Sequence, residues 1–197
     1  MKLLEKKVCL ITGAGRGIGR VIAEQFAQDG AIVYINDLQM GDMDSWAADC
    51  AKRNNTKVVP ICFDVTDTAQ LKQRLMNIYK AEGRIDTVVN NAAIIANQKL
   101  GMVTKSLLEK MYSVNVFAVI DMLQIASRLM ARNGGGNFVN IASITGVVPF
   151  RNPSNVWRLA SLNASTLISS IFLPVYVPIL LSVVIPANPR VPFEASP

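Results

Sequence analysis

The stretch that decides the fold is "KVCLITGAGRGIGRVIAEQF", residues 7–26. It opens with a short apolar run over 7–12, which is typical of a strand buried on both faces. Glycine then recurs at every second position, at Gly13, Gly15, Gly17 and Gly19. Apolar residues return after them at helical spacing, and Gly30 is a suitable helix end. The stretch therefore predicts a strand, a glycine-rich turn and a helix in direct succession.

The same alternation continues along the chain. Further strands are predicted at 31–37, 57–64, 84–93 and 137–143, where the fourth range includes an exit loop. Between them the pattern predicts a polar helix at about 42–54, a helix from Thr66 or Asp67 to about Glu82, and a long helix over about 105–132. Strands that alternate with helices form right-handed crossover units. The predicted fold is α/β, a Rossmann-type doubly wound parallel sheet.

Composition excludes several classes of protein. The chain has 197 residues, of which 51% are apolar and 17% charged, which predicts a folded domain rather than a disordered chain. The net charge of +6 is spread without a block of like charges, so we expect no nucleic-acid partner. There is no histidine, which excludes Ser-His-Asp catalysis and ordinary His-ligated metal sites, and no metal site is expected.

The cysteines and the N-terminus indicate a cytoplasmic protein. Three cysteines, Cys9, Cys50 and Cys62, form no CxxC pair and are odd in number, which indicates buried thiols in a reducing compartment. The apolar run before Gly13 is too short for a signal peptide.

The character of the sequence changes after Gly146. The last 51 residues contain no glycine and no lysine but eight of the nine prolines, and 159–189 carries no charge. Prolines interrupt every candidate strand or helix there. We therefore predict a dinucleotide-binding domain over 1–146 and an aberrant tail over 147–197 that replaces the expected C-terminal strand–helix–strand portion.

The glycine turn and an acidic residue point to a nucleotide. Glycine is needed where a turn has positive φ and where the backbone approaches a pyrophosphate, and the helix that follows offers free N–H groups. About twenty residues on, Asp37 ends the second predicted strand, where a carboxylate can accept both ribose hydroxyls and repels a 2′-phosphate. Arg16, inside the turn, argues the other way. The sequence favours NAD over NADP.

The spacing Thr12-Gly13-x-x-x-Gly17-x-Gly19, together with "NNAA" at 90–93, resembles the short-chain dehydrogenase/reductase family over about 6–146. The resemblance implies an NAD(P)-dependent oxidoreductase that transfers a hydride to or from a small carbonyl or alcohol substrate. It implies a pyrophosphate loop formed by Thr12, Gly13, Arg16, Gly17, Ile18 and Gly19. It also implies a ribose acceptor at Asp37 and an adenine contact at Asp64 and Val65. The segment that would line the cofactor is Asn90, Asn91, Ala92 and Ala93. Ala93 stands where the family usually has glycine.

The resemblance also implies two catalytic positions. Asn115 matches a helix asparagine that holds a water in the proton relay, although an N-capping or core amide is the alternative. Ser143 matches the serine that hydrogen-bonds the substrate oxygen, although a plain strand-terminal serine is equally common. The family's Tyr-x-x-x-Lys is missing, because Asn155 or Val156 replaces the tyrosine and Leu159 or Ala160 the lysine. We expect turnover to be impaired, since loss of a general acid–base costs ~10²–10⁴-fold.

Three interpretations of the tail stay open. It is an out-of-frame or aberrantly joined segment, or the chain is a non-catalytic NAD-binding pseudoenzyme. A membrane-anchored form is less favoured: the uncharged segment 167–185 is barely long enough to span a bilayer, and Pro174 and Pro178 interrupt it. The sequence leaves open whether the chain forms homo-oligomers.

Overall fold

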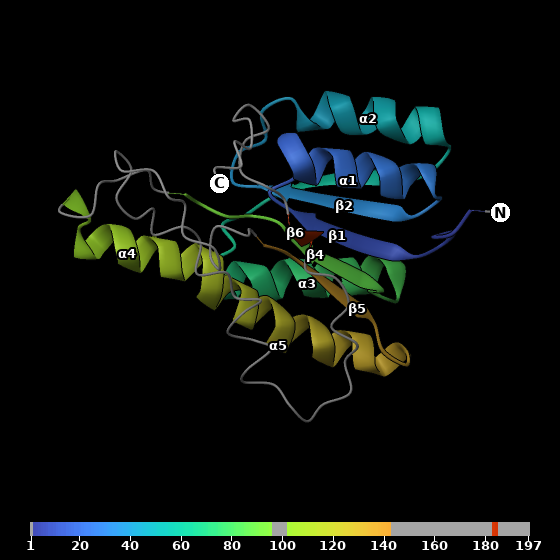
Figure 1. The fold of residues 1–197 in the computed structure, drawn as a ribbon. Coiled ribbons are helices and arrows are strands. Elements are labelled where there is room, and N and C mark those ends of the chain that lie inside the picture. Colours follow the sequence, from blue (N-terminus) through green and yellow to red (C-terminus); the bar gives the residue numbers. More distant parts are fainter. Residues whose placement is uncertain (1, 96–101, 143–182, 185–197) are drawn as a thin grey trace, which may run out of the picture.

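A parallel β-sheet organises the molecule. The computed structural model describes residues 2–95, 102–142 and 183–184 (Figure 1). The strands lie in the order β3-β2-β1-β4-β5-β6, and every neighbouring pair is parallel. Their bounds are β1 Val8–Thr12, β2 Ile32–Asp37, β3 Val58–Cys62, β4 Thr87–Asn90, β5 Asn137–Ala142 and β6 Val183–Val184.

Helices cover both faces of this sheet. In Figure 1, α1 and α2 lie on one side of the strands and α3 and α5 on the other. The helices are α1 Gly17–Gln28, α2 Met43–Asn54, α3 Thr68–Glu82, α4 Lys105–Tyr112 and α5 Ala118–Met130, with a π turn η2 Ser113–Phe117 and a 3₁₀ turn η3 Ala131–Asn133. This arrangement confirms the predicted doubly wound α/β fold.

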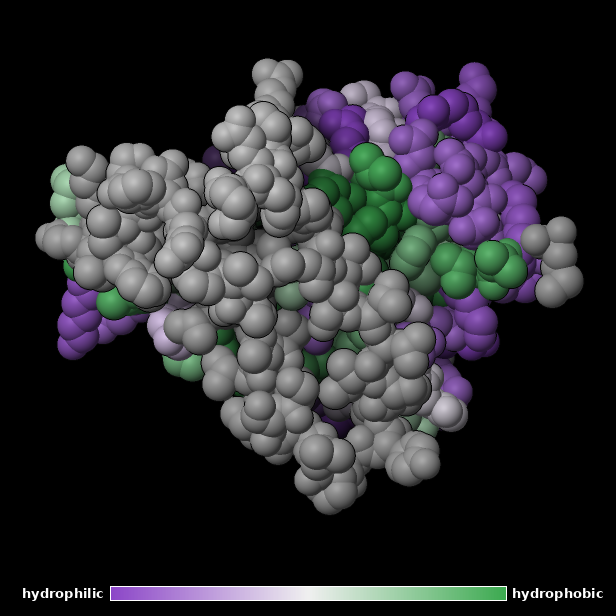
Figure 2. Space-filling model, viewed as in Figure 1, coloured by the Kyte–Doolittle hydropathy of each residue, from purple (hydrophilic) through white to green (hydrophobic). Residues whose placement is uncertain are grey.

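Alternation along the strands divides the core between the two faces. In β1, Cys9 and Ile11 join the buried cluster that α1 and α2 cover, whereas Val8 and Leu10 join the cluster on the side of α3 and α5. All five residues of β1 are buried, which explains why its sequence is continuously apolar rather than alternating. The predicted polar character of α2 is visible as the hydrophilic surface over that helix in Figure 2.

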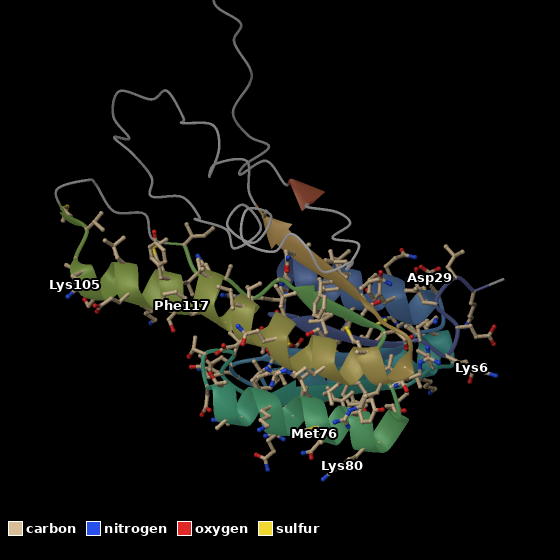
Figure 3. All side chains as sticks on the ribbon, turned by 90° about the horizontal axis from the view of Figure 1, so that it is seen from below. Lys6, Asp29, Met76, Lys80, Lys105 and Phe117 are labelled. Carbon is tan, nitrogen blue, oxygen red and sulfur yellow. The ribbon has the colours of Figure 1, made fainter. Side chains whose placement is uncertain are left out.

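The start of α3 and the end of α1 lie where the sequence predicts them. The side chain of Asp67 accepts a hydrogen bond from the Gln70 N–H and caps α3, one of the two predicted caps. Helix α1 ends at Gln28, and Gly30 follows with φ of +88°, a conformation that glycine adopts without strain. Lys6 and Asp29 lie at the amino-end edge of the sheet, at the other end of the strands from the tip of β5 (Figure 3).

The predicted long helix over about 105–132 is interrupted. The π turn Ser113–Phe117 separates α4 from α5, and such single turns are frequent at functional sites. The whole stretch Lys105–Asn133 is long and apolar enough to cross a membrane by composition. In the structure, however, Met122, Ala126 and Leu129 of α5 are buried in the core cluster that also contains residues of α3 and the sheet. A buried core helix accounts for this composition.

Two residues of the C-terminal tail form a strand. Val183 and Val184 pair with Ile141 and Ala142 as β6, so the prediction that prolines interrupt every element of the tail is wrong for these two residues. They lie in the interval between Pro178 and Pro186, which leaves room for a two-residue strand. Ser143, the domain boundary at 146/147 and all of the segment 167–185 except this pair lie outside the described residues.

The cysteines are free, as predicted. Cys9 and Cys50 are buried, whereas Cys62 is half-buried. Burial raises the pKa of the Cys9 thiol to about 12, and it also raises the pKa of the other two thiols. Neutral, buried thiols are unreactive, so Cys9 and Cys50 contribute packing rather than chemistry.

Candidate nucleotide-binding site

The candidate residues gather where the parallel strands end. Thr12 is the last residue of β1, Asp37 of β2 and Asn90 of β4, so all three lie at the carboxyl edge of the sheet. Strand order reverses at β1, because β2 lies on one side of it and β4 on the other. In sheets of this type, ligands bind in the crevice at such a reversal.

The glycine loop is packed too tightly for larger residues. A Cβ on Gly13, which has φ of +62°, would lie 2.8 Å from the Ala92 Cα. A Cβ on Gly19 would lie 2.5 Å from the Gly13 carbonyl oxygen. Gly17 differs, because its φ is +58° but no atom of the described residues lies within 4 Å of the Cβ position. Gly13 and Gly19 therefore serve internal packing, whereas no described residue fills the space beside Gly17 at the start of α1.

The N-terminus of α1 fits an anionic group. Arg16 precedes the helix with extended backbone, makes no capping hydrogen bond with its side chain, and is followed by no acidic residue in the first turn. Arg16, Gly17 and Ile18 are all exposed. Uncapped N–H groups and the positive end of the helix dipole favour a phosphate at this place. The cradle beside Gly17 therefore suits the pyrophosphate of a dinucleotide.

Thr12 joins the glycine loop to the segment after β4. Its buried hydroxyl accepts hydrogen bonds from the N–H groups of Asn91 (3.1 Å) and Ala92 (3.0 Å) and donates to the Val89 carbonyl (3.3 Å). In return, the Asn91 Nδ2 donates to the carbonyls of Thr12 (3.0 Å) and Gly13 (2.9 Å). The two motifs that carried the family resemblance thus lie together and hold each other in place.

Asp37 is fixed by the loop that it faces. Its Oδ2 accepts the Gly15 N–H at 3.0 Å, and its Oδ1 accepts the Leu38 N–H at 2.7 Å. A carboxylate has about four acceptor positions, so both oxygens can still accept ribose hydroxyls. The side chain is half-buried at the end of β2, in the place predicted for a ribose acceptor.

Arg20 is a residue of this site that the sequence did not single out. Its guanidinium donates to the Gly15 carbonyl (3.3 Å) and to both oxygens of Asp42 (2.9 and 3.1 Å), and it stacks on the Trp46 ring at 4.8 Å. It therefore ties the glycine loop to the start of α2. Helical spacing places Arg20 one turn after Arg16, but no sequence signal pairs it with Asp42.

On the adenine side, Asp64 forms a local turn. Its Oδ1 accepts the N–H (2.9 Å) and the hydroxyl (2.7 Å) of Thr66, and Val65 packs against the core. The carboxylate of Asp64 is thus committed to shaping the loop after β3. Its contact with adenine, and that of Val65, stay predictions.

Buried asparagines hold the carboxyl edge of the sheet together on the side of β4 and β5. The Asn90 Nδ2 donates to the Asn140 Oδ1 at 2.8 Å, which links β4 to β5 inside the sheet. Asn115 donates to the Ile94 carbonyl and accepts the Ile94 N–H, both at 2.9 Å. Asn115 thus positions the loop that contains Ala93, which is exposed. Asn140 was missed, because its partner lies fifty residues away in sequence.

Among the described residues, the arrangement suits a nucleotide but offers few groups for proton transfer. No cluster of three or more His, Cys, Asp or Glu side chains suitable for a metal occurs in 2–95 or 102–142. In the sequence, Tyr176 is the one tyrosine after Ser143, and no lysine follows Lys110.

Known proteins share this sequence and fold. The profile of the short chain dehydrogenase family matches residues 7–155. The 3-oxoacyl-(acyl-carrier-protein) reductase FabG of Thermotoga maritima is 35% identical over 158 residues, which are 80% of this chain and 63% of that protein. Sorbitol dehydrogenase of Cereibacter sphaeroides is 33% identical over 73% of this chain and 55% of that protein. The chain thus spans about three-fifths of the length of these relatives.

Solved structures of dehydrogenases and reductases share the fold of this chain. The carveol dehydrogenase of Mycobacterium avium in complex with NAD has a TM-score of 0.71 and 25% identity, over 79% of this chain and 61% of that one. The NADPH-dependent 3-quinuclidinone reductase of Rhodotorula rubra has a TM-score of 0.72 and 27% identity, over 76% of this chain and 56% of that one. From the matched profile over 7–155, with the glycine loop and Asn91 joined through Thr12, we conclude that the chain belongs to the short-chain dehydrogenase family.

Proposed function

We propose that this chain binds NAD(H) at the carboxyl edge of its sheet, as the nucleotide-binding part of a hydride-transfer oxidoreductase. The observation that carries the proposal is the placement of Asp37, whose carboxylate is held by the Gly15 N–H at the rim of the glycine loop. The open cradle at Gly17 and the uncapped α1 N-terminus support a pyrophosphate beside it. When bound, the nicotinamide would supply or accept a hydride.

The charge around Asp37 supports NAD over NADP. A 2′-phosphate would lie against the Asp37 carboxylate, and like charges at close range repel. Of the two arginines at the glycine loop, Arg20 is paired with Asp42 through both carboxylate oxygens, whereas Arg16 is the cation that favours NADP. Arg16 is exposed, whereas the Asp37 carboxylate is fixed by the Gly15 N–H, and this difference supports the dinucleotide without the extra phosphate.

We infer that the chain as written turns over poorly or not at all. Members of the family act on a carbonyl or alcohol substrate. Proton exchange at the substrate oxygen needs a side chain that can donate and accept a proton. Neither Asn155 nor Val156, the positions of the family's tyrosine, is a tyrosine, and neither Leu159 nor Ala160 is a lysine. The profile match ends at Asn155, within the expected tyrosine position. A non-catalytic NAD-binding role is the alternative that this observation favours.

The test exchanges the charge of Asp37. Replacing Asp37→Arg removes the ribose acceptor and the partner of the Gly15 N–H, so the Kd for NADH rises about tenfold or more in fluorescence titration. The control is Asp49→Arg, which makes the same charge change at an exposed position of α2 and leaves the Kd unchanged. Equal Kd values for both variants would contradict the proposal.

The same preparations test turnover. NADH oxidation is followed with a panel of small aldehydes and ketones, and no activity above the buffer rate is expected. A rate typical of the family would contradict the impaired turnover while leaving the binding proposal intact. Cytoplasmic location, a small carbonyl or alcohol substrate and homo-oligomer formation stay proposals.

A further inference from the structure

We propose that Asn36 is a positioning residue that sets the adenosine half of the nucleotide site, an inference that rests on the proposed NAD(H) binding. Asn36 is the next-to-last residue of β2, immediately before Asp37. It is 1% exposed, and neither the sequence motifs nor the chemistry of hydride transfer assign it a role. A buried amide in an apolar strand costs free energy unless it is hydrogen-bonded, which makes its partners informative.

The side chain of Asn36 holds the chain that leaves β3. Its Nδ2 lies 3.0 Å from the Phe63 carbonyl, and the carbonyls of Asp37 and Ile61 follow at 3.3 and 3.4 Å. Phe63 lies just past the end of β3 and directly before Asp64, which begins the turn with Thr66. The amide therefore fixes where the adenine-side loop begins.

The backbone of Asn36 holds the glycine loop. Its carbonyl accepts the Ala14 N–H at 2.8 Å, and the Oδ2 of the next residue, Asp37, accepts the Gly15 N–H at 3.0 Å. Consecutive residues of β2 thus hold consecutive residues of the loop. A shift of Asn36 would move this loop and Asp37 together.

One residue consequently contacts all three parts of the adenosine half. The phosphate loop is bound through its carbonyl, the ribose acceptor is its neighbour in sequence, and the adenine-side loop is bound through its amide. We infer that Asn36 holds the site in its binding geometry before the nucleotide arrives, which lowers the ordering cost of binding. Substitution should therefore weaken ligands that carry adenosine more than it weakens the nicotinamide fragment.

The test uses fragments of the dinucleotide on the full 197-residue chain. Asn36→Ala is expected to raise the Kd for AMP and for NADH about tenfold in calorimetric titration. The affinity for nicotinamide mononucleotide should change less than twofold, because that fragment does not reach the β2–β3 side. A general loss of structure would weaken both fragments, so the difference between them reports positioning.

The matched control is Tyr34→Phe. Tyr34 lies two residues earlier in β2, so it is on the same face of the strand, and it is 5% exposed. The phenylalanine variant lacks only the 2.6 Å hydrogen bond from the Tyr34 hydroxyl to Glu82. Its AMP affinity should equal that of the parent chain. Circular dichroism first confirms that each variant is folded. If Asn36→Ala is unfolded, Asn36→Thr is used, because threonine suits a strand and keeps one donor.

The outcomes separate the two proposals. A parent chain that binds neither NADH nor AMP would overturn the proposed function and the role of Asn36 with it. A parent chain that binds AMP, with an Asn36 variant that is folded and binds it equally well, would overturn the role of Asn36 alone. That role would also be overturned if Tyr34→Phe weakened AMP binding as much as the Asn36 variant does.

Discussion

At the residue scale, the site depends on backbone N–H and carbonyl groups that a few side chains hold in place. The Thr12 hydroxyl accepts hydrogen bonds from two backbone N–H groups, and the Asn91 amide donates to two backbone carbonyls. Asp37 accepts the N–H of Gly15. Each of these bonds crosses between segments far apart in sequence. Together these bonds join the glycine loop to the ends of β2 and β4.

Gly19 offers a direct test of this tight packing. In Gly19→Ala, the new Cβ would lie 2.5 Å from the Gly13 carbonyl oxygen and 2.6 Å from the Asn91 Nδ2, so the loop must shift. We expect a loss of about 2 kcal/mol in unfolding free energy by urea denaturation, together with weaker NADH binding.

The control for Gly19 is Gly41→Ala. Gly41 has φ of +51° and no atom of the described residues within 4 Å of its Cβ position, so alanine there adds backbone strain without a clash near the loop. NADH affinity should be unaffected in this variant. Equal NADH affinity in the two alanine variants would contradict the packing role of Gly19.

At the element scale, the interrupted helix positions the loop after β4. The π turn carries Asn115 to a position from which its side chain makes two hydrogen bonds to the backbone of Ile94. The helix itself is anchored farther along, where Met122 and Leu129 enter the core and Asp121 accepts the Thr68 hydroxyl at 2.6 Å. Asn115 thus connects the loop after β4 to a helix that is packed in the core.

Removing the Asn115 side chain should loosen that loop. Asn115→Ala leaves the N–H and the carbonyl of Ile94 without this partner, and we expect about 2 kcal/mol less unfolding free energy. Hydrogen exchange at 92–95 should also become faster. Ser113→Ala serves as the control, since it lies in the same π turn and its side chain bonds to none of the described residues. Equal urea midpoints for the two variants would contradict this role.

At the scale of the whole molecule, an ionic cluster secures the edge opposite the site. Asp86 is 8% exposed and accepts hydrogen bonds from the Val8 N–H (2.9 Å), Lys7 (3.3 Å) and Arg84. Burial raises the pKa of this carboxyl, but these three donors outweigh it and hold the pKa below its usual range. The cluster fixes the start of β1 beside β4.

This cluster predicts a loss of stability in acid. Because the pKa of Asp86 is lower in the folded chain than in the unfolded chain, its contribution is present at neutral pH and is lost as the pH falls from about 5 through the folded-state pKa. Asp86→Asn should cost about 2 kcal/mol of unfolding free energy at pH 7 and less at pH 3. Asp49→Asn, at an exposed site, should cost little at either pH. A constant cost for Asp86→Asn across this range would contradict the assignment.

Much of this molecule follows from local sequence signals. The continuous apolar run of β1, the glycine-rich turn after it and a cap for α3 at Thr66 or Asp67 each express chemistry contained within a few residues, so sequence alone predicts them. Asn36, Asn140 and Arg20 act through partners 25, 50 and 22 residues away, which no local pattern identifies. The π turn was also invisible, because one extra residue barely changes the periodicity of a long apolar helix.

The most direct test of the central claim is a calorimetric titration of the unmodified chain with NADH, followed by NADPH. We predict saturable binding of NADH and weaker binding of NADPH, because the fixed Asp37 carboxylate accepts a ribose hydroxyl and repels a phosphate. Absence of saturable heat with NADH would contradict nucleotide binding. Tighter binding of NADPH would contradict the role of Asp37.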